Sequence, residues 1–173
     1  MIRDLLNISI RLAYRCAYLA LRAWWFVRRP HSHGAAVALW HEGKVLLVRT
    51  SYRNCYSLPG GFVEKGEPPE QGARRELREE LGIDLSAQAL RHAWSETLNF
   101  ESRRDTIDIW ETLVESAPAL RVTGREIIWA GWLSPSDALA ERLLPHIAAY
   151  LACRRDQGEG LGRRDRNSAN SSS

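Results

Sequence analysis

Apolar and polar residues repeat with different periods along the chain, and these periods predict both helices and strands. Residues 2–27 contain no glycine or proline, which predicts one helix that ends before Pro30. At 100° per residue, several of its arginines fall within one narrow sector, and the rest of the surface is broadly apolar. The arginines of that sector are Arg11, Arg15, Arg22 and Arg29. The pattern therefore predicts a basic amphipathic helix, followed by a linker over residues 30–33.

Short apolar runs in the middle of the chain predict strands. They are expected over residues 34–40, 45–49, 89–97, 106–114 and 126–133. Residues 41–44, His-Glu-Gly-Lys, predict a hairpin turn, and residues 99–105 predict a polar loop. Ser134 followed by Pro135 predicts the start of a helix with a hydroxyl cap, and residues 143–153 predict the last helix. Strands with a helix among them and another at the end indicate an α/β fold.

The stretch from residue 60 to residue 83 predicts the central helix. Pro68 and Pro69 suit its first turn, where a missing N–H costs nothing. Gly82 suits the position just past its end, where φ is often positive. An apolar stripe recurs every four residues, at Ala73, Leu77 and Leu81. A second face carries three glutamates, which are Glu76, Glu79 and Glu80.

These glutamates allow two interpretations. Glu76 and Glu80 are one turn apart, and carboxylates about 4 Å apart repel by about 1 kcal/mol in water and about 4 kcal/mol at a partly shielded surface. A hard divalent cation removes that repulsion, and Mg²⁺ prefers carboxylates, waters and phosphate oxygens. The other interpretation is a solvated face of arginines and glutamates, which the i,i+4 pair of Glu70 and Arg74 favours.

The whole stretch resembles the Nudix box, the signature of the Nudix hydrolases. The family pattern is Gly, five residues, Glu, seven residues, Arg-Glu-aliphatic, any residue, Glu-Glu, any residue, Gly-aliphatic. All nine fixed positions are filled without a gap, by Gly61, Glu67, Arg75-Glu76-Leu77, Glu79-Glu80 and Gly82-Ile83. The preceding Leu58-Pro59-Gly60 also fits the usual lead-in. The resemblance in strand order extends over residues 34–153.

The resemblance implies a domain organisation. Residues 34–153 are expected to form a Nudix hydrolase domain, an α/β/α sandwich with a mixed sheet between helices. Residues 1–30 precede it as the basic amphipathic helix. Residues 154–173 are charged and then rich in serine, asparagine and glycine, which predicts a disordered tail.

The resemblance also implies an activity. Nudix hydrolases cleave a pyrophosphate bond in a nucleoside diphosphate linked to another moiety, with Mg²⁺, or Mn²⁺, activating water. By resemblance, the metal ligands are Glu76, Glu79, Glu80 and the Gly60 carbonyl. Glu76 or Glu79 is the expected base, while Arg75 orients a glutamate. The alternative is a non-catalytic Nudix-fold nucleotide-binding or membrane-associated interaction module, which loss of a box glutamate would favour; none is lost.

Substrate-binding residues outside the box are expected from position and type. Arg49 and Arg53 are placed to reach a phosphate, and Glu126 to supply a further carboxylate at the start of its strand. Phe62, Tyr56 or Phe100 would stack on a base, although each suits core packing equally well. Glu101 and Asp105 are rivals of Glu126 on the polar loop. The chain lacks the proline and the tyrosine typical of the ADP-ribose and dinucleoside polyphosphate members. The substrate is therefore expected to be a nucleotide-type small molecule of unspecified identity.

Charge and cysteine content limit the partners and the location. The net charge is +3, but the first thirty residues hold six arginines against one aspartate. The remainder is slightly acidic, so no broad nucleic-acid surface and no DNA partner are expected. Three cysteines, far apart in sequence, show no disulfide framework or metal motif, which favours a reducing cytoplasm.

The role of the first thirty residues has three interpretations. Arginines interrupt each apolar run, so the helix does not read as a membrane span. It is expected to pack on its own domain, to join two copies in a homodimer, or to lie on the inner face of a membrane. In each case we expect a peripheral docking element that stands outside the catalytic machinery, and burial of the apolar face in a packed helix is the slightly favoured interpretation.

Overall fold

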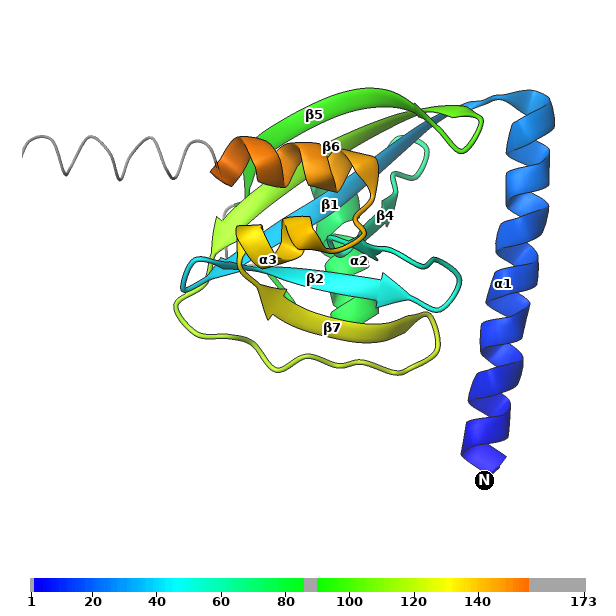
Figure 1. Ribbon diagram of the computed structural model, residues 1–173, viewed down its shortest axis with the longest axis horizontal. Coiled ribbons are helices and arrows are strands. Elements are labelled where there is room, and N and C mark those ends of the chain that lie inside the picture. Colours follow the sequence, from blue (N-terminus) through cyan, green and yellow to red (C-terminus); the bar gives the residue numbers. More distant parts are fainter. Residues whose placement is uncertain (1, 86–89, 156–173) are drawn as a thin grey trace, which may run out of the picture.

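The computed structural model describes residues 2–85 and 90–155 of the chain. It shows a seven-stranded sheet between two helical layers, with a long helix, α1, beside the sandwich (Figure 1). The predicted tail falls almost entirely on residues 156–173, which lie outside the described residues. The α/β/α sandwich with a mixed sheet and a preceding helix is confirmed.

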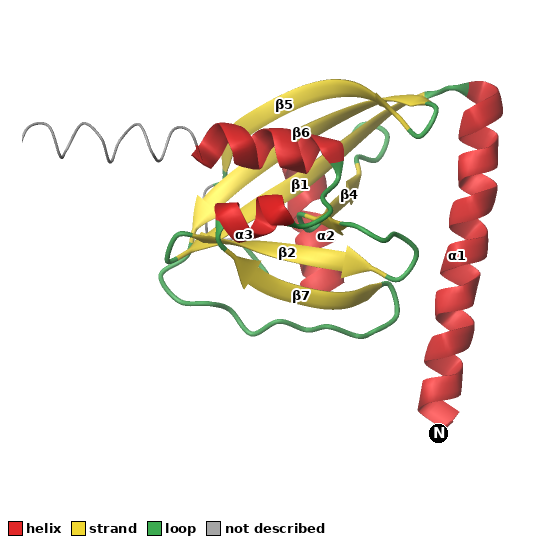
Figure 2. Ribbon diagram, viewed as in Figure 1, coloured by secondary structure: helices red, strands yellow, loops and turns green. Residues whose placement is uncertain are grey.

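The elements follow the predicted order (Figure 2). The named helices are α1 (Ile2–Arg28), α2 (Pro69–Leu81) and α3 (Pro135–Ala140), and a further helix occupies residues 145–155. The strands are β1 (His31–His41), β2 (Lys44–Thr50), β3 (Tyr56–Ser57), β4 (Gly60–Phe62), β5 (Arg91–Phe100), β6 (Arg103–Leu113) and β7 (Ile127–Leu133). Ser134 caps α3 as predicted, because its hydroxyl accepts a hydrogen bond from the Asp137 N–H.

Strand β1 organises the sheet. It pairs in parallel with β6 along ten residues, and in antiparallel fashion with β2 near one end and with β4 near the other. Strand β5 extends the sheet beyond β6, and β7 extends it beyond β2. Because β2 and β4 meet different ends of β1, the sheet opens between them, and α2 packs against β1 and β4 there.

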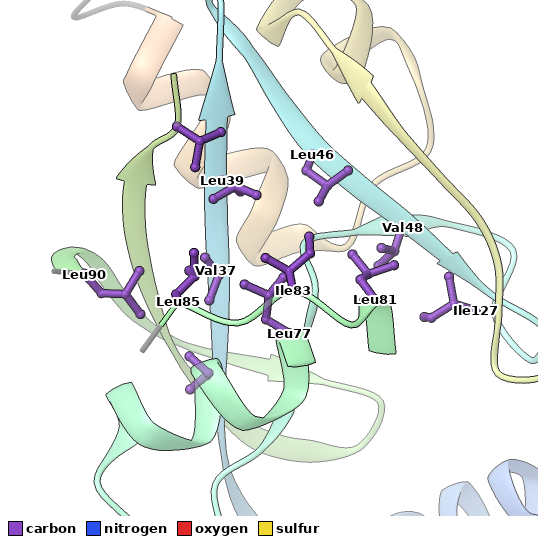
Figure 3. Packing of buried hydrophobic residues seen from close by; sticks show 13 residues of the cluster. Val37, Leu39, Leu46, Val48, Leu77, Leu81, Ile83, Leu85, Leu90 and Ile127 are labelled. Carbon is purple, nitrogen blue, oxygen red and sulfur yellow. The ribbon is translucent and has the colours of Figure 1, made fainter. Parts of the chain in front are cut away.

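Two hydrophobic cores cover the two faces of the sheet. Alternate residues of β1 point to opposite faces, so Val37 and Leu39 join one core and Ala36 and Ala38 the other. The first core contains the apolar stripe of α2, and Figure 3 shows Leu77 and Leu81 packed against the β1 and β2 side chains. The second core contains residues of α3 and of the helix at 145–155. Burial of the apolar stripe in the first core fixes α2 against the sheet.

Two predicted connections are shorter than expected. The loop over residues 99–105 is instead a tight hairpin, in which Glu101 and Ser102 both have positive φ (49° and 62°) between two long strands. The linker over residues 30–33 is mostly strand, because β1 begins at His31 and pairs with β6 from there. Strand pairing thus overrides the polar character of both segments.

Helix α1 packs on its own domain, and it does so through its arginine sector. Arg11 Nε donates to the Gly124 carbonyl at 2.7 Å, and Arg15 Nε donates to the Ser51 carbonyl at 3.0 Å. The slightly favoured expectation that the apolar face is buried is therefore wrong for the single chain. No helix among the described residues combines the length and apolar character needed to cross a bilayer.

The stability of the first core should depend on the stripe of α2. Leu77 is fully buried, so Leu77→Ala should lower the free energy of unfolding by about 2–5 kcal/mol through lost burial and a cavity. Gln71→Ala, at an exposed position of the same helix, should change it by less than about 0.5 kcal/mol. Urea denaturation of both variants measures the difference, and equal effects would contradict the assigned packing.

Candidate active site

The acidic face of α2 meets the short strand β4. Pro69 occupies the first turn of the helix, and Gly82 ends it in the left-handed region with φ 71°. Between them, the apolar stripe packs on the sheet and turns Glu76 and Glu80 toward β4 and β1. The helix therefore places two of its glutamates where the sheet opens.

Glycine backbone lets these carboxylates come close to β4. The Gly60 N–H donates to Glu80 Oε2 at 3.0 Å, and the Glu76 carboxylate lies directly over the Gly61 Cα. A Cβ atom at Gly61 would overlap that carboxylate, and one at Gly60 would overlap the Ala35 carbonyl of β1. Both glycines are thus needed for close approach.

Arg75 holds one wall of the site together. Its Nε donates to Glu67 Oε1 at 3.0 Å, and its Nη1 donates to Glu76 Oε1 at 2.7 Å. Its Nη2 donates to the Phe62 carbonyl at 3.0 Å. The hydrogen bonds from Arg75 lower the pKa of Glu67. This planar fork fixes the Glu76 carboxylate relative to β4.

Partial burial raises the pKa values of two glutamates of α2. Burial raises the pKa of Glu80 well above its usual range, against the opposing hydrogen bond from the Gly60 N–H, and the charges of Glu76 and Glu126 add to this. Burial also raises the pKa of Glu76, although Arg75 opposes the shift. A site with this electrostatic balance favours a bound cation or a proton.

A cavity of about 340 Å³ opens beside these carboxylates. Its acidic wall is formed by Glu76, Glu80 and Glu126, and its basic groups are Arg53, Arg75 and Arg103. The volume is that of a small-ligand site. Acidic groups next to basic groups suit a ligand that binds a cation through one part and presents anionic oxygens to the arginines.

The structure brings together most of the residues predicted for the site. Glu76, Glu80, Gly60, Arg75, Phe62 and Glu126 all line the cavity. The Glu126 carboxylate accepts a hydrogen bond from the Tyr52 hydroxyl at 3.0 Å. Of its two rivals, Asp105 lines the cavity and is ion-paired with Arg103, whereas Glu101 is not among the lining residues.

Two predicted residues lie outside that group. The Glu79 side chain is 58% exposed, and its carboxylate lies 3.6 Å from Arg75 Nη1. Arg49 is not among the cavity-lining residues, and its guanidinium lies over the Tyr56 ring. Glu79 thus stands at the edge of the acidic cluster, while Arg49 is separate from it.

The donor set fits a hard divalent cation in chemical type. Within the described ranges, no three His, Cys, Asp or Glu side chains are already arranged as a metal cluster. Instead Glu76 is paired with Arg75, and Glu80 accepts the Gly60 N–H. Desolvation nevertheless raises the pKa of both Glu76 and Glu80, and a bound cation would oppose that shift. Carboxylate and carbonyl oxygens are the ligands that Mg²⁺ prefers.

Helix α1 braces the wall of the cavity with a stripe of aromatic residues. The Tyr18 and Tyr52 ring centroids are 5.0 Å apart, and Arg53 Nε donates to the Tyr18 hydroxyl at 2.9 Å. The Arg103 guanidinium lies 3.7 Å from the centroid of the buried Trp25 ring. Tyr52, Arg53 and Arg103 line the cavity, although none of the described α1 residues does.

This contact was missed from the sequence. Tyr14, Tyr18 and Trp25 share the sector of Arg11 on a helical projection, so a polar-aromatic stripe was there to be found. This stripe is amphipathic rather than apolar, so hydrophobic periodicity alone does not mark it. The placement of α1 modifies the expectation of a merely peripheral element, since α1 contacts side chains that line the cavity.

Comparison with known proteins connects this geometry to a family. The family model of the NUDIX domain matches residues 30–152. A MutT-like protein of Streptomyces ambofaciens is 31% identical over 119 residues, which are 68% of this chain and 71% of that protein. The match thus covers most of both chains.

Two further similarities give less information: one covers a short segment, and the other shows the fold alone. An ADP-ribose pyrophosphatase of Methanocaldococcus jannaschii is 37% identical over 57 residues, 31% of this chain and only 34% of that protein. The crystal structure of a MutT protein from Methanosarcina mazei superposes with a TM-score of 0.65 at 22% identity. That superposition covers 76% of this chain and 97% of the other, and it shows a common fold.

The desolvated carboxylate of Glu80 should make the metal-free protein sensitive to pH. The pKa of Glu80 in the folded chain is raised above 4.5, its ordinary value in the unfolded chain. Below pH 4.5 the carboxyl is therefore mostly protonated in both states. As the pH rises, the unfolded chain ionises first, and stability falls until the pH has passed the folded-state pKa. Glu80→Gln cannot ionise, so in EDTA its Tm should exceed that of the wild type near about pH 8.

The same difference in Tm should vanish near about pH 4, where both side chains are neutral. Glu115→Gln, at an exposed position, is the matched control and should follow the wild type at each pH. Thermal denaturation across this range measures the effect. A constant difference between Glu80→Gln and wild type at all pH values would contradict the assigned burial.

Docking of α1 should depend on one of two adjacent tryptophans. Trp25 is 3% exposed and Trp24 is 51% exposed. Trp25→Ala should lower the free energy of unfolding by about 3 kcal/mol, because it removes buried area and the contact with Arg103. Trp24→Ala should change it by less than about 0.5 kcal/mol. Equal losses in urea denaturation would show that α1 does not dock through this face.

Proposed function

Since the chain belongs to the Nudix hydrolase family, we propose that it catalyses Mg²⁺-dependent hydrolysis of a pyrophosphate bond in a nucleoside diphosphate linked to another moiety. The observation that carries this proposal is the convergence of Glu76, Glu80 and Glu126 on one cavity beside a complete set of motif residues. Mn²⁺ would suit the same oxygen ligands.

The residues of the acidic cluster have distinct proposed roles. Glu76, Glu79, Glu80 and the Gly60 carbonyl would hold the metal ion, which supplies charge neutralisation and an activated water. Glu76 or Glu79 would accept the proton of the attacking water. Of the two, Glu76 is the better oriented, because Arg75 fixes it, while Glu79 is the freer to move. Arg75 and Glu67 would act as positioning residues.

The remaining cavity walls would bind the substrate. Arg53 and Arg103 offer guanidinium groups to phosphate oxygens, and Phe62 offers a half-exposed ring to a base. Each arginine is also paired with Glu101 or Asp105, so its position is fixed before a ligand binds. Arg49 has no proposed contact with substrate, since it lies away from the cavity.

The substrate class rests on the family and on its named members. The M. jannaschii relative is an ADP-ribose pyrophosphatase, but the match spans about a third of it. This chain also lacks the proline that ADP-ribose members often carry after the motif. A nucleoside diphosphate derivative is therefore the substrate class proposed, with the cytoplasm as the place of action.

Replacement of the box glutamates should separate catalysis from folding. Glu79→Gln and Glu80→Gln should each lower kcat by about two orders of magnitude or more, because each removes a metal-binding carboxylate. Glu70→Gln, in the first turn of the same helix and ion-paired with Arg74, should keep kcat within about twofold.

The assay would measure phosphate-bond cleavage with MgCl₂ across nucleotide sugars, dinucleotides and nucleoside triphosphates. Circular dichroism would confirm that each variant is folded. Turnover like that of the wild type in both Glu79→Gln and Glu80→Gln would contradict the assigned site. A folded wild-type protein that binds nucleotides but cleaves none of them would instead favour the non-catalytic alternative.

A further inference from the structure

The face of α1 that points away from the domain is apolar and exposed. Leu12, Leu19 and Phe26, seven residues apart, are 60%, 61% and 66% exposed. Exposed neighbours on the same half of the helix are Leu6, Ile8, Trp24, Val27 and the four alanines Ala13, Ala17, Ala20 and Ala23. In a helical projection this half carries no charged residue. The helix thus presents its apolar side to the outside.

The apolar side of α1 faces outward because the surface of the domain opposite α1 is polar. The docked stripe meets backbone carbonyls and the polar rim of the cavity, so arginines and tyrosines fit there and leucines would not. The outward half is then left uncovered along a helix of about 40 Å. A continuous apolar surface of this length is unusual on a soluble domain and marks an interaction site.

Charge distinguishes the possible occupants of this face. Arg22 and Arg28 are exposed along its borders, and Asp4 is the only acidic residue of α1. A second copy packed on this face in a symmetric contact would bring arginines toward arginines, with no acidic row to pair them. An anionic bilayer offers apolar depth to the leucines and negative headgroups to the arginines.

The aromatic residues fit the same occupant. Trp24 and Phe26 are exposed at the end of the helix nearest to Arg28 and Arg29. Aromatic side chains next to arginines favour the boundary between headgroups and acyl chains. Because α1 has the domain on its other side, it is suited to lie on a bilayer rather than to cross it, as Figure 1 makes visible.

We propose that α1 is an interfacial anchor, which binds an anionic membrane surface through its outward face and carries the catalytic domain on its arginine face. One side of the helix thereby binds the membrane, and the opposite side holds the domain. The cavity wall braced by Tyr18 and Trp25 then lies on the side of α1 away from the lipid. The proposal is independent of the substrate and of catalysis.

Full-length protein and vesicles test the proposal. Flotation would use phosphatidylcholine vesicles with and without phosphatidylserine, at low and at high salt. The wild type should float with the anionic vesicles at low salt and should be largely released at high salt, because salt screens the arginine contribution. Leu19→Glu should weaken the partition by about tenfold or more, since it removes a buried apolar side chain and adds a charge on the lipid side.

Leu113→Glu is the matched control, because Leu113 is 73% exposed on β6 and receives the same change of charge. It should bind vesicles like the wild type. Arg28→Gln combined with Arg29→Gln should reduce the preference for anionic vesicles while both residues stay outside the docked contacts described above. Thermal denaturation without lipid should give all variants a similar Tm, which separates lost binding from lost folding.

Two results would overturn the proposal. One is wild-type protein that stays in solution with anionic vesicles at low salt. The other is a dimer in sedimentation velocity that Leu19→Glu dissociates and Leu113→Glu does not, which would assign the outward face to a second copy of the chain. If Leu19→Glu proves unstable, Leu12→Gln at the equivalent position one heptad earlier provides the same test, with the same outcomes.

Discussion

Desolvation of the carboxylates on α2 is the constraint on which the rest of this structure depends. Glu80 and Glu76 are brought against the sheet by a helix that packs through Leu77 and Leu81. Their burial costs free energy that a solvated helix would not incur, and the core beneath them supplies it. Gly60 and Gly61 remove the side chains that would keep the carboxylates away. The carboxylates are thus held in place by apolar packing.

The guanidinium groups divide into two sets with different tasks. Arg75 lies within the acidic cluster and fixes the direction of Glu76. Arg53 and Arg103 also line the cavity, and they contact Tyr18 and Trp25 of α1. Planar guanidinium groups favour such stacked and forked contacts, which lysine does not reproduce. A wall that is ordered before binding lowers the cost of holding an anionic ligand.

Helix α1 is amphipathic, but its polar side faces the domain and its apolar side faces outward. An apolar stripe usually faces the domain, because burial of apolar area is the main source of stability. Here the surface beside the cavity is polar, with carbonyl groups at Ser51 and Gly124 that accept arginine donors. Complementarity of hydrogen-bond groups therefore decides which side of α1 docks, and the apolar side is left for another surface.

The sequence by itself determined the elements and the local chemistry. The spacing of Pro69, Leu77 and Gly82 defined α2, the period-two strands defined the sheet, and the motif identified the glutamates that share one helical face. These features depend on neighbours within a few residues, so local rules are sufficient to predict them. The hairpin at Glu101 escaped the same rules, because β6 is extended by its pairing with the distant β1, and β5 by its pairing with β6.

Only the tertiary structure decided which residues from distant segments share the cavity. Glu126 joins Glu80 there, and Arg49 does not, because the pairing of β2 with β3 and β7 sets the direction of each side chain. The same holds for α1, whose two faces are both plausible contact surfaces in the sequence. The choice depended on what the folded domain presents opposite the helix, and that surface exists only after strands distant in the chain have paired.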